Sequence, residues 1–197
     1  MGYIIAGLGN PGEEYNNTRH NIGRIVVERF AKEMGADFLF QKNHKAWEAK
    51  GKLDKESILL TLPDTFMNNS GRAIAPLVKN IKACEKLVVV HDDLDIPFGK
   101  MKMVFNRGSG GHNGVESIRK SLKTSAFMRV RIGVATTTPS GKIKKPKGED
   151  AVIKFILGKF STSEEKELKK IIKHAVSGLA LLVEEGRDRA MNNFNTS

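Results

Sequence analysis

The sequence predicts an α/β protein, a three-layer α/β/α sandwich around a mixed, mostly parallel central sheet. Apolar strand-like segments alternate with amphipathic helical segments along most of the chain, which is typical of parallel sheets covered by helices. A continuous apolar run at 87–90 favours a central strand that is buried on both faces. Three strand-like segments, at 38–41, 46–51 and 57–62, follow one another without a helix, and this meander indicates that the sheet is mixed.

Length, cysteine content and charge narrow the class of protein. The length of 197 residues suits one domain spanning 1–197. No apolar run approaches the roughly 18 residues of a membrane helix, no secretory signal is visible, and the single cysteine, Cys84, fits a reducing cytoplasm. A formal net charge of +11 favours a polyanionic partner such as RNA, DNA or anionic lipid, and an ordinary basic protein is the alternative.

The chain opens with a predicted strand–loop–helix unit. Residues 3–8 form the strand, and residues 19–34 form a helix whose apolar positions recur at helical spacing until Gly35 ends it. The glycine-rich and asparagine-rich loop between them contains Asn10 and ends near His20, in or just before the first helical turn. Because α/β proteins keep their chemistry at strand ends and helix starts, His20 is the predicted reactive group.

The middle of the chain continues the alternation of strands and helices. Residues 63–70 lead into a helix, and the apolar strand at 86–91 runs into the acidic segment 91–95. A further strand is predicted at 100–105. The predicted buried face of the helix is Ile74, Leu77, Val78 and Ile81.

The last part of the chain contains a second glycine-rich segment, 107–114, which opens a helix, and then a strand at 127–134. Residues 136–150 are polar, basic and rich in helix breakers, which predicts a mobile loop or lid. A short apolar segment at 151–158 precedes a long helix that Ser161 caps. The apolar stripe of that helix is Leu168, Ile171, Ile172, Ala175, Leu179, Leu182 and Val183.

Polar side chains gather at four places where predicted strands end or helices begin, namely 10–20, Met67-Asn68, His91-Asp92-Asp93 and His112-Asn113. Such ends converge on one edge of an α/β sheet. A histidine there can serve as a general base, a carboxylate can orient it, and amides can bind a carbonyl or stabilise an oxyanion. Because the chain has no Gly-x-Ser-x-Gly motif, direct attack by water fits better than a covalent enzyme intermediate.

Other classes of site fit the sequence less well. The glycines of 7–12 match a dinucleotide-binding pattern, but Pro11 interrupts it and the helix starts about seven residues after the last glycine. The Walker spacing of NTPases is absent. The segment 91–95 offers metal-ligating side chains without a usual ligand spacing, so no metal is predicted. Asn68 and Asn113 also suit helix caps or turns.

Basic residues recur in the second half of the chain. Their density matches the overall positive charge, which favours contact with a phosphate backbone over an ordinary solvated face. These residues are Lys100, Lys102, Arg107, Arg119, Lys120, Lys123, Arg129, Arg131, Lys142, Lys144, Lys145 and Lys147.

Six segments between residues 7 and 158 contain distinctive motifs in a fixed order. They are Gly7-Leu8-Gly9-Asn10-Pro11-Gly12 with Tyr15 and Thr18-Arg19-His20-Asn21-x-Gly23, Thr65-Phe66-Met67-Asn68-x-Ser70-Gly71, His91-Asp92-Asp93-Leu94-Asp95, Gly110-Gly111-His112-Asn113-Gly114, Arg129-x-Arg131-Ile132-Gly133, and Phe155-Ile156-Leu157-Gly158. Together they resemble the bacterial-type peptidyl-tRNA hydrolase family, and residues 190–195 share that resemblance.

The resemblance implies a monomeric cytoplasmic enzyme without a cofactor or membrane partner, which hydrolyses the ester between a peptide and the 3′ end of tRNA. His20 is implied as the catalytic base, Asp92 as its hydrogen-bond partner, and Asn10 as the group that separates blocked from free aminoacyl-tRNA. The residues implied to contact the peptide, the 3′ end or the acceptor stem are Tyr15, Phe66, Met67, Asn68, His112, Asn113 and Arg131. Tyr15 and Phe66 suit stacking on bases.

One position departs from the family pattern. Family members often carry a basic residue where this chain has Val104, and Lys102, Arg107 and Arg131 are the alternatives for holding a tRNA phosphate. The full set of polar residues is retained, so an enzyme is expected. A catalytically inactive RNA-binding relative of the same fold is the alternative.

Overall fold

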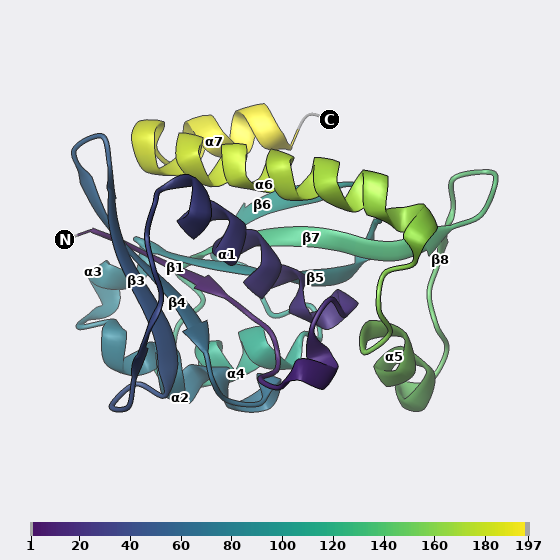
Figure 1. Ribbon diagram of the computed structural model, residues 1–197, viewed down its shortest axis with the longest axis horizontal. Coiled ribbons are helices and arrows are strands. Elements are labelled where there is room, and N and C mark those ends of the chain that lie inside the picture. Colours follow the sequence, from purple (N-terminus) through teal and green to yellow (C-terminus); the bar gives the residue numbers. More distant parts are fainter. Residues whose placement is uncertain (1, 196–197) are drawn as a thin grey trace.

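The computed structural model describes residues 2–195 and contains one eight-stranded sheet (Figure 1). The strand order is β2-β3-β4-β1-β5-β7-β6, and β8 pairs with β7. Four parallel neighbours form the centre: β4 (Glu56–Pro63), β1 (Tyr3–Gly7), β5 (Leu87–Pro97) and β7 (Met128–Thr137). The antiparallel outer strands are β2 (Leu39–Gln41), β3 (Ala46–Leu53), β6 (Met101–Phe105) and β8 (Ile143–Lys144). The predicted mixed sheet is confirmed.

Helices cover both faces of this sheet (Figure 1). One face carries α1 (Ile22–Glu33), α6 (Glu165–Glu185) and α7 (Arg187–Phe194), and the other carries α2 (Ser70–Ile74), α3 (Ile81–Cys84) and α4 (Asn113–Leu122). Side chains of β1 alternate between the two layers, because Ile5 packs in the cluster under α1 whereas Ile4 and Ala6 pack in the cluster under α4. The three-layer sandwich is therefore confirmed.

Short 3₁₀ helices connect several of these elements. They are η1 (Glu13–Tyr15), η2 (Arg19–Asn21), η3 (Met67–Asn69), η4 (Ala75–Leu77) and η5 (Thr162–Glu164). Ser161 forms a capping box with Glu164, whose carboxylate accepts the Ser161 N–H at 2.7 Å, so Ser161 caps η5, the 3₁₀ turn that leads directly into α6. Gly35 has a φ of +65°, which suits the predicted end of α1.

The helix predicted after residue 70 is wrong in its length and in part of its buried face. It breaks into α2, η4 and α3, and Pro76 lies within the break. Proline has no amide hydrogen and its ring clashes with the preceding turn, so it ends the regular helix. Ile81 begins the separate α3 and is 72% exposed.

Two further boundaries differ from the prediction. β5 does not end at His91 but continues to Pro97, with an irregular register against β7 after Asp93. The apolar segment at 151–158 is mostly a helix, α5 (Glu149–Ile156), which lies beyond the end of the sheet (Figure 1). Within the predicted loop at 136–150, β8 pairs with the end of β7, and the mobility of this loop stays a prediction.

The C-terminal segment protects an edge of the sheet. The Asn195 side chain accepts the Met103 N–H and donates to the Met103 carbonyl, both at 2.8 Å, so it pairs part of the outer strand β6. Within residues 2–195, no helix has the length and apolar character needed to cross a membrane.

Candidate active site

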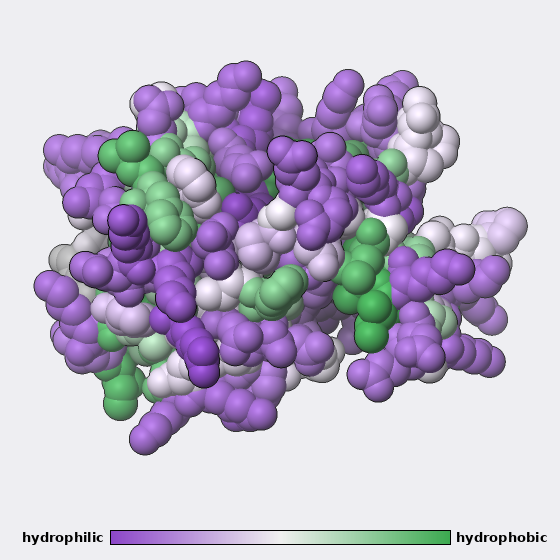
Figure 2. Space-filling view, turned by 60° about the horizontal axis from the view of Figure 1, so that its bottom comes forward, coloured by the Kyte–Doolittle hydropathy of each residue, from purple (hydrophilic) through white to green (hydrophobic). Residues whose placement is uncertain are grey.

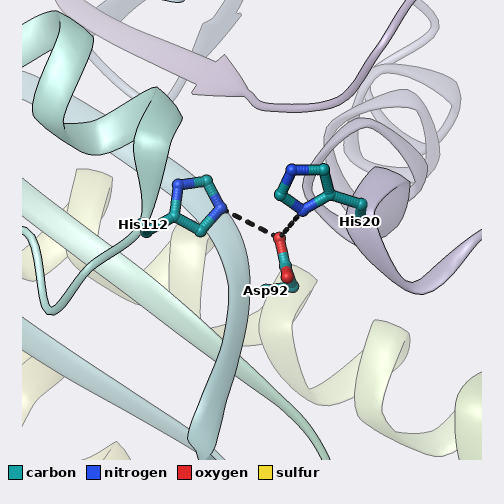
Figure 3. A group of neighbouring side chains, drawn as sticks. All are labelled: His20, Asp92 and His112. Carbon is teal, nitrogen blue, oxygen red and sulfur yellow. Dashed lines mark hydrogen bonds and ion pairs between the residues drawn. The ribbon is translucent and has the colours of Figure 1, made fainter. Parts of the chain in front are cut away.

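Three side chains from distant segments meet at one carboxylate oxygen (Figure 3). His20 Nδ1 lies 2.8 Å from Asp92 Oδ1, and His112 Nε2 lies 2.9 Å from the same oxygen. His20 belongs to the turn η2, Asp92 to the central strand β5, and His112 to the glycine-rich loop that opens α4. His20 is 8% exposed and Asp92 is 3% exposed, so the pair is nearly shielded from solvent.

The hydrogen bonds distinguish three neighbouring histidines. His112 Nδ1 accepts the Val115 N–H at 3.3 Å, which caps α4 and leaves Nε2–H to donate to Asp92. His91 bonds the Asp92 carbonyl through Nδ1 at 2.6 Å, and its Nε2 is buried without a partner in residues 2–195. His20 uses only Nδ1 for Asp92, and its Nε2 points away from that carboxylate (Figure 3). Of the three, His20 is therefore the one placed to exchange a proton with a ligand.

The electrostatic environment also distinguishes His20 from His91. Burial lowers the pKa of His20, but the charge and hydrogen bond of Asp92 outweigh burial and raise that pKa above its ordinary value. Burial acts to raise the pKa of Asp92, yet His20 and His112 hold it well below the usual range. Complete burial, together with His112 and Arg129, places the pKa of His91 well below its ordinary value. Asp92 is thus ionised near neutral pH, whereas His91 is neutral.

A pocket of about 300 Å³ opens over this group. His20, Asp92, His112 and Asn113 line its inner wall. The opposite wall is apolar and comes from α5, through Val152, Ile153 and Ile156. Figure 2 shows the hollow on an otherwise mainly hydrophilic face, with apolar surface on its α5 side. The pocket can therefore hold a ligand that is apolar on one side and polar near His20.

Acidic side chains also line the pocket, and one of them contacts the predicted lid. They are Asp93, Asp95 and Glu149. Asp95 forms an ion pair with Lys145 of the 136–150 segment. This contact connects the segment to the pocket.

Asn10 follows β1 and is held by two neighbours. The Asn21 side chain accepts the Asn10 N–H and donates to the Asn10 carbonyl, both at 2.9 Å. Asn10 Oδ1 accepts the Met67 N–H at 2.8 Å, which leaves its Nδ2 hydrogens for another acceptor. The sequence predicts no role for Asn21, although it follows His20 directly and belongs to the motif at 18–23.

Asn10 and Met67, which a hydrogen bond joins, lie outside the lining of the pocket, as do Tyr15 and Phe66. Met67 packs on Gly114, where an added Cβ would lie 2.4 Å from the Met67 sulfur. The rings of Tyr15 and Phe66 meet edge to face with centroids 6.5 Å apart, and Phe66 is 57% exposed. These residues extend the site from the pocket toward an exposed aromatic pair.

The remaining predicted binding residues lie farther from the pocket interior. Asn68 is exposed and accepts a 3.3 Å hydrogen bond from Asn69. Arg131 donates to the Asp93 carboxylate at 2.7 Å. Lys102 is exposed, as is Arg107. Arg131 is thus linked to the pocket through Asp93, which lines it.

Arg19, next to His20, is a second residue for which the sequence predicts no role. Its guanidinium binds both oxygens of Glu164, at 2.9 and 2.8 Å, and the carbonyls of Gly158 and Lys159, at 3.2 and 2.8 Å. It also lies over the ring of Phe155, 4.8 Å from the centroid. Arg19 thus fixes the connection between α5 and α6 to the turn that carries His20.

The metal alternative at 91–95 does not match the geometry. Within residues 2–195, the one group with suitable ligand atoms is His20, Asp92 and His112, all within 4.8 Å of one another. These atoms form hydrogen bonds to each other.

A buried carboxylate–histidine pair beside the Asn113 amide, open to a pocket at the edge of an α/β sandwich, has the groups that a hydrolase with general-base catalysis requires. The sequence profile of the peptidyl-tRNA hydrolase family matches residues 4–197. The peptidyl-tRNA hydrolases of Syntrophotalea carbinolica and Aquifex aeolicus are each 38% identical to this chain over 193 residues, which cover 98% of it and 96% and 95% of those proteins. The chain belongs to the peptidyl-tRNA hydrolase family.

A solved structure agrees with this assignment. The crystal structure of peptidyl-tRNA hydrolase from Acinetobacter baumannii aligns with a TM-score of 0.88 and 32% sequence identity, covering 99% of this chain and 95% of that one.

Proposed function

We propose that the protein hydrolyses the ester between a peptide and the 3′ end of tRNA, with water as the nucleophile and His20 as the general base. The main support is the orientation of His20: Nδ1 is bonded to an ionised carboxylate, and Nε2 is left for a water molecule. Membership of the peptidyl-tRNA hydrolase family supplies the substrate class.

The proposed reaction needs only water and groups of this chain. His20 Nε2 takes a proton from water while the water oxygen attacks the ester carbonyl carbon. The Asn113 amide and the N-terminal end of α4 stabilise the negative charge on the tetrahedral intermediate. When the bond to the ribose oxygen breaks, His20 returns its proton to that oxygen, which releases a peptide acid and a tRNA with a free hydroxyl.

Asp92 is proposed to orient His20 and to stabilise its protonated form. Both effects follow from one short hydrogen bond in a nearly buried position. His112 helps to hold the carboxylate in place, since it donates to the same oxygen. We assign His112 as a positioning residue because both of its ring nitrogens are already bonded.

Asn10 is proposed to recognise the blocked amino group of the substrate. Because the Met67 N–H occupies its Oδ1, the Nδ2 hydrogens can donate to the carbonyl oxygen of an N-acyl group. A free aminoacyl ester has no such carbonyl and also carries a positive charge. Asn68 and Met67 are proposed to contact the same part of the peptide.

The 3′ end of tRNA is proposed to bind along the aromatic pair of Tyr15 and Phe66, which offers faces for base stacking. Arg131, Lys102 and Arg107 are the proposed phosphate contacts near the acceptor stem, in place of the basic residue absent at Val104. We further propose a single domain that acts as a monomer in the cytoplasm, where translation produces its substrate.

The test is release of N-acetyl-amino acid from N-acetyl-aminoacyl-tRNA, with free aminoacyl-tRNA as the control substrate. We expect hydrolysis of the first, little of the second, and loss of activity in His20→Ala with unchanged folding. Normal turnover by His20→Ala would remove the assigned base. If the wild-type protein binds tRNA tightly and cleaves neither ester, the alternative of an inactive RNA-binding relative would stand instead.

A further inference from the structure

A row of lysines on α6 lies outside the site described above. Lys166, Lys169, Lys170 and Lys173 are all exposed, and Lys169 and Lys170 each lie three or four residues from Lys166 and from Lys173, so the four share one side of the helix. Arg29 of α1 and Lys100 of the turn between β5 and β6 lie beside this row. We name these six residues the basic ridge.

Two grooves flank the basic ridge. The groove toward α1 has a volume of about 370 Å³ and is lined by Arg29, Lys169 and Lys173 together with two isoleucines. The groove on the other side has about 310 Å³, and Lys100 and Lys170 line it. The positive side chains therefore stand on both walls of recesses, where an anionic group can approach two of them at once.

Much of this charge is not neutralised by the protein. Within residues 2–195, Lys170 pairs with Glu167 at 3.2 Å and Arg29 pairs with Glu33 at 2.9 Å, and the other four cations of the ridge form no ion pair. His174, in the second groove, has a lowered pKa, because of burial and then because of the nearby Lys100. The charge of Lys100 thus disfavours a further positive charge in this groove, in the same direction as burial.

Two connections along the chain link the basic ridge to the candidate active site. Glu164, just before α6, is bound to Arg19, the neighbour of His20. From Lys166 to Lys173 the helix rises by about 10 Å. Lys100 follows the end of β5, the strand that carries Asp92. The ridge therefore begins on α6 within two residues of Glu164, whose carboxylate binds the neighbour of His20 in the chain.

We propose that the basic ridge binds the phosphate backbone of the double-helical part of tRNA while the acylated 3′ end occupies the pocket. This inference rests on the proposed function and adds to it the surface that recognises tRNA beyond its end. A row of cations along grooves suits regularly spaced phosphates. A membrane-binding helix would instead expose large apolar side chains, and within residues 2–195 those of α6 and α1 are at least partly buried.

The test compares two variants with four lysines changed to glutamine. The ridge variant is K166Q, K169Q, K170Q and K173Q, because glutamine keeps a good helix propensity. The control variant is K52Q, K55Q, K79Q and K82Q, which removes the same charge from exposed positions around the β3–β4 turn and α3, at the other end of the molecule (Figure 1). Each is assayed with full-length N-acetyl-aminoacyl-tRNA and with a short acylated oligonucleotide that represents only the 3′ end.

We expect the ridge variant to raise the KM for full-length tRNA by about tenfold or more, with kcat and the KM for the oligonucleotide unchanged. Its binding of deacylated tRNA should also show a log Kd against log salt slope smaller by about two to four. The control variant should change the KM for full-length tRNA and the salt slope much less. Binding of deacylated tRNA is measured separately from hydrolysis, so the ridge can be supported even if the wild-type protein cleaves no ester.

The proposal would be overturned if the ridge and control variants changed the KM for full-length tRNA equally. It would also be overturned if the ridge variant bound deacylated tRNA as tightly as wild type. An equal rise of KM for the oligonucleotide would also overturn it, because the lysines would then act on the 3′ end. Binding to vesicles that contain phosphatidylserine is measured in parallel. If only the ridge variant loses this binding while its tRNA affinity is unchanged, the surface is assigned to lipid and the RNA role is excluded.

Discussion

Replacing Asp92 by asparagine should move the acid limb of the pH profile of kcat/KM to lower pH. In the native protein the charge and hydrogen bond of Asp92 raise the pKa of His20, whereas burial lowers it. We therefore expect the wild-type limb above about pH 6.5, the ordinary pKa of histidine. In Asp92→Asn only burial remains, so the limb should fall below about pH 6.5. The measurement is kcat/KM for N-acetyl-aminoacyl-tRNA against pH, which reports ionisations of the free enzyme.

Asp92→Asn should lower kcat/KM as well as move the acid limb of its pH profile. On the high-pH plateau we expect kcat/KM to drop by about 10²–10⁴-fold, the usual contribution of an oriented general base. This corresponds to about 3–5 kcal/mol of transition-state stabilisation. The physical reason is that a neutral amide at position 92 no longer stabilises the imidazolium that forms when His20 takes a proton from water.

The same substitution should destabilise the fold in a pH-dependent manner. Because the pKa of Asp92 is lowered in the folded state, its carboxylate contributes stability above the unfolded-state pKa of about 3.9. That contribution is lost as the pH falls through the lowered folded-state value. Urea unfolding should therefore show a lower free energy of unfolding for Asp92→Asn at neutral pH, and the difference should shrink in acid.

The matched control is Glu116→Gln, which removes one negative charge from α4 where the carboxylate pairs with Arg119. It should leave the acid limb within a few tenths of a pH unit of wild type, on the order expected for a screened surface charge. An acid limb that stays in place in Asp92→Asn, or moves to higher pH, would refute the assignment of His20 as a base whose pKa Asp92 raises.

Three further substitutions test other parts of the structure. Asn10→Ala should reduce the preference for N-acetyl-aminoacyl-tRNA over free aminoacyl-tRNA by about tenfold, the value of one hydrogen bond, measured as a ratio of kcat/KM. Arg19→Ala should lower the free energy of unfolding by about 2–3 kcal/mol in urea, because it removes the bonds to Glu164 and to two carbonyls. Gly23→Ala should cost at least about 2 kcal/mol in the same assay, because its Cβ would lie 2.2 Å from the Val90 carbonyl oxygen, which belongs to the backbone of β5. A Gly23→Ala protein as stable as wild type would show that α1 and β5 can separate freely.

The spacing of apolar residues along the chain predicted several helices and strands correctly. α1 and α4 bury faces with helical spacing, and the apolar run at 87–90 is the buried part of the central strand β5. The convergence of strand ends on one edge predicted that His20 and Asp92 lie near each other, although 72 residues separate them. The hydrogen bond that joins them follows from the parallel order of β1 and β5, since η2 comes after β1.

Contacts that depend on tertiary packing could not be predicted from the same patterns. The cap that His112 provides to α4 fixes its tautomer, yet histidine has no strong sequence preference for that position. The helix α5 follows Gly148, which has no side chain that could mark a helix start. The apolar residues of α5 alone therefore did not show where the helix begins. The break at Pro76 was visible in the sequence, but the apolar spacing around it favoured a continuous helix.

The turn η2 explains why the sequence located His20 only to within one helical turn. A 3₁₀ turn of three residues has too few internal hydrogen bonds to fix its own side chains. Each of its residues instead makes a long-range contact: Arg19 with Glu164, His20 with Asp92, and Asn21 with the backbone of Asn10. The position of His20 is therefore set from three directions by segments far apart in the chain. A substitution at Glu164 should displace His20 through Arg19, whereas a substitution on the exposed face of α1 should leave His20 in place.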